Sequence, residues 1–211
     1  MKRILCFGDS NTWGYIPGGN GARYPADVRW PGILQKELQP AFLIIEEAQN
    51  GRTTVFDDPY EVVCKNGSKH LPIILESQKP LDLVIVMLGT NDLKAYLNQT
   101  AHGSAQAAGV LVQRILESDA GPNNTAPKVL LIAPVAIVDG KCPFGHKFDG
   151  APAKSRAMPK AYQEIATEYS VAFLGTAGLA EASAIDCVHL DEAGHASLGK
   201  AAAKAVYELL K

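Results

Sequence analysis

The 211-residue sequence contains no long hydrophobic run. Its most continuous apolar stretch, residues 83–88, is far shorter than the ~20 residues that a membrane span requires. Near the N-terminus, four apolar residues are followed at once by Gly8 and Asp9, whereas a secretory signal needs an apolar region of roughly 7–15 residues. We therefore expect a cytoplasmic protein that has no membrane partner.

Charge of one sign is not in excess, and cysteine is scarce. There are 20 Lys and Arg residues against 22 Asp and Glu, for a formal net charge of -2; because a phosphate backbone attracts a basic surface, we expect no nucleic acid partner. Cys6, Cys64, Cys142 and Cys187 are scattered without the close pairs of zinc or redox motifs. A chain of this length can bury a core without covalent cross-links, so we predict four free thiols.

Several motifs of other enzyme classes are also missing. No Gly-x-Gly-x-x-Gly or Walker loop follows the first apolar run, which argues against dinucleotides and nucleoside triphosphates. The Gly-x-Ser-x-Gly elbow of the larger hydrolase fold is absent, since the nearest string, residues 195–199, lacks its first glycine. A metallophosphoesterase would need several more histidines near its carboxylates. We expect neither a metal nor an organic cofactor.

Five short apolar runs alternate with helical patterns. The runs are continuous rather than alternating with polar residues, as in strands that are covered on both faces. Residues 108–115 and 198–209 each have apolar residues at helical spacing. This order predicts one α/β domain, residues 1–211, with a five-stranded parallel sheet between helix layers. The expected strands are residues 4–7, 42–45, 83–88, 129–133 and 171–174.

Two segments, residues 14–24 and 138–155, are rich in glycine and proline and do not fit this alternation. Unstructured connections longer than ~12–15 residues are uncommon in compact domains and are often functional. We interpret both segments as loops that form walls of a pocket.

The residues that follow the apolar runs can carry acyl-transfer chemistry. In an open parallel sheet, ligands bind beyond the carboxyl ends of the strands, and the fold gathers Ser10, Gly51, Asn91, Asp186 and His189 at that edge. A serine nucleophile needs a base, and the base needs a group that orients it. We predict Ser10 as nucleophile, His189 as base and Asp186 as its partner. The amides of Ser10 and Gly51 and the side chain of Asn91 would form the oxyanion hole.

Each of these residues also has a purely structural reading. Ser10 alone would be a helix N-cap, and Asn91 with Asp92 a capped turn. Asp9 is expected to accept backbone amides at its turn. His195 could pair with Asp191 as an alternative base, but both fall on the predicted last helix, where Asp191 is placed as N-cap. The three remaining histidines lack suggestive partners and are expected at the surface, with His146 a candidate substrate contact: they are His70, His102 and His146.

Four blocks in the chain resemble those of the SGNH, or GDSL, hydrolases. The blocks are Gly8-Asp9-Ser10, Gly51, Gly89-x-Asn91-Asp92 and Asp186-x-x-His189, in the family's order. The resemblance implies a flavodoxin-like three-layer sandwich and an esterase or thioesterase that uses the residues assigned above.

A narrower similarity is to the bacterial aryl esterase and acyltransferase branch. It rests on residues 3–14, 27–30, 46–47, 52–54, 57–59 and 88–94. The branch implies cleavage of small aryl and alkyl esters; some of its members transfer acyl groups to alcohols or peroxide, and some form closed oligomers, so a homo-oligomer is one expectation. It also implies that Trp13 faces the site and limits acyl length, although Trp13, Tyr15 and Trp30 could equally be core aromatics. The commoner second block begins with Asn, whereas residues 47–51 here read Glu-Ala-Gln-Asn-Gly.

The sequence therefore predicts a serine esterase that forms an acyl-enzyme on Ser10. Its partner would be a small-molecule ester with a short acyl or aryl group, or a thioester, and we expect Asn11, Trp13 and Asn50 to contact it. The alternatives are a carbohydrate acetylesterase or lysophospholipase-type SGNH enzyme, a metal-dependent phosphoesterase, and a non-catalytic flavodoxin-like binding module.

Overall fold

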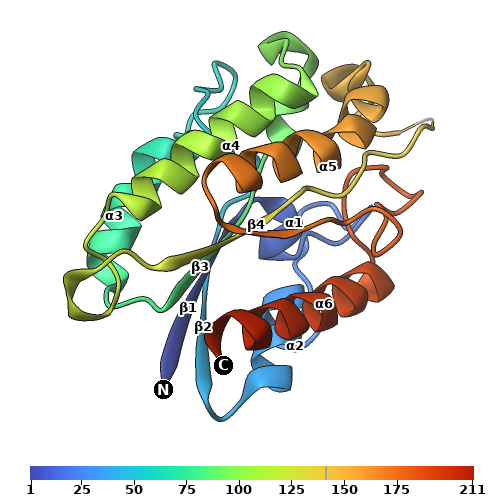
Figure 1. Cartoon of the computed structure of the whole chain (residues 1–211). Helices are drawn as coiled ribbons and strands as arrows, with labels where there is room; N and C mark the ends of the chain where they lie inside the picture. The colour runs from blue at the N-terminus through green and yellow to red at the C-terminus, as the bar shows by residue number, and fades with distance from the viewer. Residues whose placement is uncertain (141) are drawn as a thin grey trace.

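A five-stranded, entirely parallel sheet forms the centre of the computed structural model, which describes residues 1–140 and 142–211 (Figure 1). The strand order is β2-β1-β3-β4-β5. β2 lies on one side of β1 and the later strands lie on the other, so the order in which strands are added to the sheet reverses between β1 and β3. This confirms the predicted α/β fold. The strands are β1 (Lys2–Gly8), β2 (Phe42–Ala48), β3 (Leu83–Met87), β4 (Lys128–Ile132) and β5 (Ala172–Leu174).

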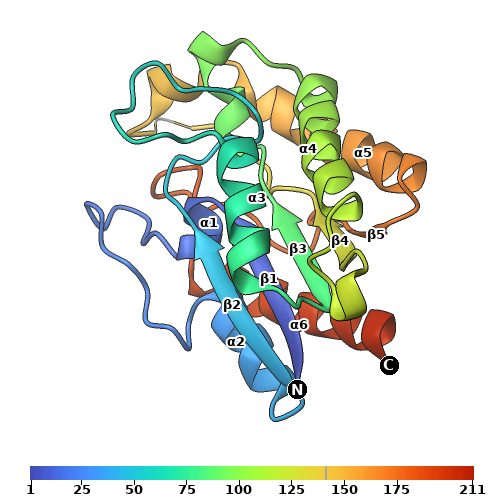
Figure 2. The same cartoon turned by 90° about the vertical axis from the view of Figure 1, so that its left-hand side faces the viewer.

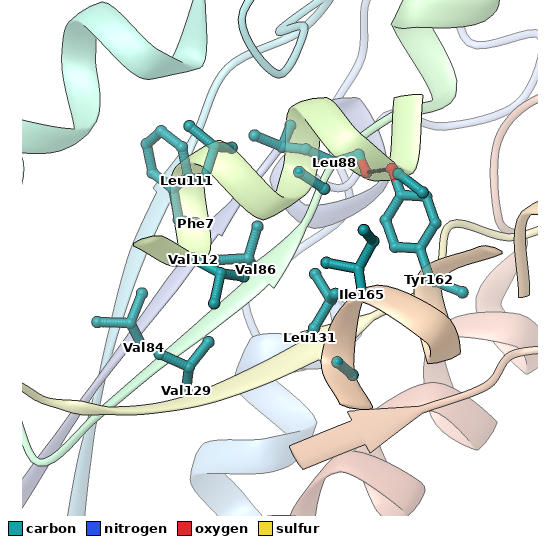
Figure 3. Packing of buried hydrophobic residues seen from close by; sticks show 14 of the residues in the cluster. Phe7, Val84, Val86, Leu88, Leu111, Val112, Val129, Leu131, Tyr162 and Ile165 are labelled. Atoms are coloured by element: carbon teal, nitrogen blue, oxygen red, sulfur yellow. Dashed lines mark hydrogen bonds between the residues drawn. The ribbon is translucent and has the colours of Figure 1, made fainter. Parts of the chain in front are cut away.

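Helices cover both faces of the sheet. One layer consists of α3 (Gly67–Gln78), α4 (Ala101–Leu116) and α5 (Ala151–Glu168), and the other of α2 (Trp30–Leu38) and α6 (Glu192–Leu210). Figures 1 and 2 show the two layers on opposite sides of the strands. Each layer has its own core, and Figure 3 shows Val112 of α4 beside Val86 of β3, with Leu111 near Phe7 of β1 in the same core.

Local sequence explains where the main helices begin. Asp191 caps α6 by accepting a hydrogen bond from the Gly194 amide at 2.8 Å, which confirms the predicted cap. Thr100 caps α4 through the Gly103 amide at 2.9 Å. The apolar stripe of each helix faces the sheet, and this burial supplies most of the stability of an amphipathic helix.

The second predicted loop is shorter than expected. Residues 151–155 form the first turn of α5, because Gly150 has a φ of 71°, which reverses the chain, and Pro152 suits the first turn of a helix. A short 3₁₀-helix, η4 (Gly145–Phe148), lies within the remaining segment. Lys141, which falls in the predicted loop, lies outside the described residues.

The prediction of four free thiols is wrong for two of the cysteines. Cys142 and Cys187 form a disulfide, although 45 positions separate them in the sequence. Spacing reveals only local cysteine pairs, and this pair is created by the fold. In the described part of the chain, Cys6 and Cys64 remain free thiols, the first buried and the second exposed.

The carboxyl ends of β1, β2 and β3 lead into the segments that carry the predicted site residues. Helix α1 (Ser10–Trp13) directly follows β1, residues 49–66 follow β2, and the 3₁₀-helix η1 (Thr90–Leu93) follows β3. In Figure 2 these segments lie beyond the arrowheads, beside the loop that precedes α6. Across the described ranges, no helix has the length and apolar character that a membrane crossing requires.

Candidate active site

Ser10, His189 and Asp186 form a continuous hydrogen-bonded series. His189 Nε2 lies 2.9 Å from Ser10 Oγ, and His189 Nδ1 lies 2.7 Å from Asp186 Oδ2. All three side chains are buried, although Ser10 and His189 also line a cavity. The structure thus brings together a hydroxyl, an imidazole and a carboxylate that are up to 179 positions apart.

Asp186 is held as a carboxylate by its own loop. Its Oδ1 accepts the amides of Val188 at 3.1 Å and His189 at 3.0 Å. Burial alone would raise the pKa of Asp186, but the hydrogen bonds from the His189 side chain and from these amides outweigh it and lower the pKa. An ionised Asp186 favours a proton on Nδ1 of His189, which leaves Nε2 free to accept the proton of Ser10.

Asn11 connects α1 to this loop. Its Nδ2 donates to the Val188 carbonyl at 3.1 Å, and its Oδ1 accepts the Leu190 amide at 2.8 Å. Both ends of the amide are therefore used by the protein backbone, and the described cavity lining does not include Asn11. The structure assigns Asn11 to positioning Ser10 against His189 rather than to the predicted substrate contact.

The residues of the three expected oxyanion donors, Ser10, Gly51 and Asn91, all line the cavity. Among residues 1–140 and 142–211, the amides of Ser10 and Gly51 donate to no protein acceptor. Asn91 Nδ2 donates to the Arg52 carbonyl at 3.1 Å and makes a long contact of 3.4 Å with Asp9 Oδ2. The two unused amides can stabilise an anionic oxygen, and Asn91 Nδ2 can add a third hydrogen bond by exchanging its long contact with Asp9 for that oxygen.

Arg52 is a structural residue of the site that the sequence interpretation missed. Its Nη1 donates to the carbonyls of Gly8 at 2.9 Å and Glu47 at 2.6 Å, and its guanidinium lies 4.3 Å from the centre of the Phe7 ring. Burial lowers the pKa of Arg52 to about 10. Arg52 therefore anchors the turn that presents Gly51, in a segment that lacks the commoner Asn. The available signal was its place directly after the glycine of the second block.

Asp9 and Asp92 are buried carboxyls that accept hydrogen bonds from the segments that carry the site residues. Asp9 accepts the Asn11 amide at 3.0 Å, as predicted for a turn. Asp92 accepts the amide and the hydroxyl of Thr54 and the hydroxyl of Ser104. Burial raises the pKa of each carboxyl to about 6, in opposition to these hydrogen bonds.

The competing histidine, His195, lies in α6 away from the cavity. It is fully buried, its Nδ1 accepts the Trp30 amide at 3.3 Å, and Asp191 is engaged in the helix cap. Burial lowers the pKa of His195 to about 4. In the described lining of the cavity, neither His195 nor His146 is present.

The two glycine-rich loops supply aromatic walls beside His189. The ring of Tyr15, from the first loop, stacks on His189 with centroids 4.3 Å apart, and the Phe144 ring, from the second, meets His189 edge-on at 5.8 Å. Trp13 is not among the described lining residues, and its ring lies 4.9 Å from the Arg23 guanidinium. The predicted wall is thus formed by Tyr15 instead of Trp13.

Asn50 lines the cavity, as its predicted contact requires. Its Oδ1 is buried and has no hydrogen-bond partner in the described structure. Three charged residues that sequence reasoning did not select, Glu61, Lys65 and Lys147, also line the cavity. Over the described ranges, no group of three or more His, Cys, Asp and Glu side chains is arranged to hold a metal ion.

A buried Ser-His-Asp series at the carboxyl edge of a parallel sheet has the geometry that activates a serine hydroxyl for acyl transfer. Residues 6–197 match the model of the GDSL-like Lipase/Acylhydrolase family. The chain belongs to this family and is an ester hydrolase.

Solved structures agree with this assignment. The aryl esterase of M. smegmatis is 40% identical, with full coverage of both chains and a TM-score of 0.94. Est24, a carbohydrate acetylesterase from Sinorhizobium meliloti, is 38% identical, again with full coverage and a TM-score of 0.94. A lipase/acylhydrolase from Enterococcus faecalis, 19% identical over 100% of this chain and 98% of its own with a TM-score of 0.68, shares the fold. No curated protein sequence matches this chain.

Proposed function

We propose that the protein hydrolyses small carboxylic esters through an acyl-enzyme on Ser10. The observation that carries the proposal is the unbroken series from Ser10 Oγ through His189 to Asp186. The alternative of a non-catalytic binding module gives no reason for these three groups to be hydrogen-bonded in series beside a cavity.

In the first step, Ser10 Oγ attacks the ester carbonyl carbon while His189 Nε2 takes the hydroxyl proton. The carbonyl oxygen becomes an anion beside the amides of Ser10 and Gly51 and the side chain of Asn91. When the tetrahedral intermediate collapses, His189 returns the proton to the departing alcohol, and Ser10 carries the acyl group. A water molecule then attacks the acyl carbon while His189 accepts its proton, and the return of that proton to Ser10 releases the carboxylic acid. Each oxyanion donor is worth about 3 kcal/mol of barrier in comparable sites.

The cavity that carries this chemistry measures about 200 Å³, a size that favours a short acyl or aryl group. One structural neighbour is an aryl esterase, which supports aryl esters, and another is a carbohydrate acetylesterase, which supports a sugar acetate as the second candidate. Turnover of thioesters and acyl transfer to alcohols follow the same acyl-enzyme and stay predictions, as does a lysophospholipase-type activity.

The decisive experiment compares hydrolysis of p-nitrophenyl acetate by the wild type and by Ser10→Ala. Loss of the nucleophile is expected to lower kcat at least about a thousandfold. Equal activity in the two proteins would reject the serine mechanism. Activity that is lost with EDTA and restored by a divalent ion would favour the phosphoesterase instead. If no ester is turned over and phenylmethylsulfonyl fluoride does not label Ser10, the binding module is favoured.

The base is tested with a pair of histidine variants. His189→Ala should abolish the acylation burst, because no other described group is placed to accept the Ser10 proton, while His195→Ala should retain it. Asp186→Asn should lose less activity than His189→Ala, because the oxyanion donors remain in place. The reverse ranking of the two histidines would contradict the assignment.

Location and assembly belong to the same proposal. The cytoplasmic location and the homo-oligomer stay predictions. The Cys142–Cys187 disulfide is of a kind that is rare in a reducing cytosol. Non-reducing mass spectrometry of the protein taken from its native cells would show whether the disulfide forms there.

A further inference from the structure

The wall of the catalytic cavity that lies beside the oxyanion loop is charged. Glu61 Oε2 lies 3.7 Å from Lys65 Nζ, and Glu61 Oε1 lies 3.5 Å from Lys147 Nζ. All three side chains line the same cavity as Ser10 and His189. Lys65 and Glu61 come from the segment after β2, while Lys147 comes from η4, so two separate loops contribute the charges.

Lys65 lies close to the position where the oxyanion would form. A methyl group placed on the Gly51 Cα would come within 3.5 Å of Lys65 Cε. A third lysine, Lys94, is nearby, but its ammonium is paired with Asp58 at 2.6 Å and both side chains are almost completely buried. The charge of Lys94 is therefore neutralised by Asp58. The positive charge that faces a substrate comes from Lys65 and Lys147.

The charges of this wall do not balance. In the described lining, two ammonium groups share one carboxylate; the carboxylate of the catalytic series, Asp186, is bonded to His189 Nδ1 and does not line the cavity. One surplus positive charge in a partly enclosed cavity attracts an anionic group of a ligand. Aliphatic side chains would have served equally well to enclose a neutral ester, and they would have avoided the cost of partly desolvating two ammonium groups.

We propose that Lys65 and Lys147 form a subsite for a carboxylate carried by the ester substrate. The proposal rests on the proposed function, because it assigns the substrate class of the same site. The carboxylate would form ion pairs with the two ammonium groups and would compete with Glu61 for them. It can belong either to the acyl chain or to the leaving alcohol, and both sources have the same chemistry.

Two matched substrate pairs test the proposal. For the acyl side, mono-p-nitrophenyl adipate is compared with its methyl ester, since both release the same phenol. For the alcohol side, 4-acetoxybenzoate is compared with 4-acetoxybenzamide. We expect the anionic member of at least one pair to have a kcat/KM about fivefold higher than the neutral member, because one charge pair near 4 Å in a wet site is worth about that factor. The pair that shows the preference identifies which side of the ester carries the charge.

The ratio of anionic to neutral kcat/KM is then measured in charge variants. Lys147→Met and Lys65→Met should each move the ratio toward one. Glu61→Gln should raise it, because the lysines lose the carboxylate that competes with substrate. Lys160→Met, an exposed residue of α5, is the matched control and should keep the wild-type ratio. About 0.5 M NaCl should reduce the ratio in the wild type through screening.

The outcomes separate the two proposals. If the wild type hydrolyses the neutral esters through Ser10 but both ratios are at or below one, the carboxylate subsite is overturned and the esterase assignment stands. If the three variants change both members of a pair in parallel, the charges serve only to hold the two loops together, which also overturns the subsite. If neither neutral nor anionic esters are turned over, the proposed function itself fails.

Discussion

At the scale of single residues, the ring of His189 is held by groups on three sides. Asp186 bonds one nitrogen, Tyr15 stacks on one face at 4.3 Å, and Phe144 approaches edge-on. Tyr15 is itself anchored, because its hydroxyl accepts the Gly21 amide at 3.1 Å. In the proposed mechanism His189 becomes an imidazolium, and an electron-rich ring against it would stabilise that cation by about 0.5–2 kcal/mol, the range of cation–π contacts.

This arrangement makes Tyr15 a positioning residue with a measurable effect. Tyr15→Leu should lower kcat about three- to thirtyfold while KM for p-nitrophenyl acetate changes less, because the lost contact acts mainly on the charged transition state. Steady-state kinetics provide the measurement. Tyr15→Phe, which keeps the ring, should restore most of kcat. A Tyr15→Leu variant that changed only KM would show that the ring contacts substrate and does not support the base.

At the scale of elements, the loop after β4 is tied covalently to the loop that carries the catalytic pair. Cys187 lies between Asp186 and His189, and its disulfide partner, Cys142, precedes Phe144. A main-chain bond from the Val138 amide to the Cys187 carbonyl at 2.9 Å reinforces the connection. The cross-link therefore holds one aromatic wall of the cavity against the loop that holds the base.

Breaking the cross-link should affect both stability and substrate binding. Cys142→Ser should lower the free energy of unfolding by about 2–4 kcal/mol, the range expected for a loop of this length, and should raise KM because Phe144 and Lys147 lose their anchor. Urea unfolding and ester kinetics, with and without dithiothreitol, are the measurements. The wild type should respond to the reductant and Cys142→Ser should not. Cys64→Ser, at an exposed free thiol, should behave as the wild type; a wild type that is indifferent to reductant would contradict the expectation.

At the scale of the whole molecule, buried ionisable groups make stability depend on pH in opposite directions. The pKa of His195 falls from 6.5 to about 4 on burial. Between those values the unfolded chain binds a proton that the folded chain does not, so stability is lost as the pH falls. Asp9 and Asp92, whose pKa values rise from 3.8 to about 6, bind extra protons in the folded state, so their contribution decreases as the pH rises through that window.

Replacing His195 isolates one of these opposing effects. His195→Asn keeps an acceptor for the Trp30 amide and removes the titrating ring, so the variant should lose about 3 kcal/mol less stability than the wild type between pH 6.5 and pH 4. The contributions of Asp9 and Asp92 are common to both proteins and cancel in the difference. Urea titrations at half-unit steps of pH give the two curves, and parallel curves would exclude His195 as the source of acid sensitivity.

The catalytic residues could be proposed from the sequence because they follow apolar runs that the pattern marks as strands and fall in four blocks that resemble those of a known family. The roles of Asn11 and Trp13 could not. An asparagine beside a nucleophile can face substrate or backbone, and only the position of the loop at Val188 and Leu190 shows that both ends of the Asn11 amide are used. Trp13 and Tyr15 are two residues apart on one turn, and the direction of each ring depends on what packs against it.

The sequence by itself determined that the chain lacks a long hydrophobic run and a charge bias, that it forms a parallel α/β sheet, and which residues follow its strands. These properties depend on composition and on local periodicity, which a single chain displays directly. Only the tertiary structure decided that Cys142 pairs with Cys187, that Tyr15 rather than Trp13 faces His189, and that Lys65 and Lys147 share the catalytic cavity. Each of these depends on contacts between segments that are far apart in the chain. Packing and charge interactions depend on how close groups lie in space, which separation along the sequence does not give.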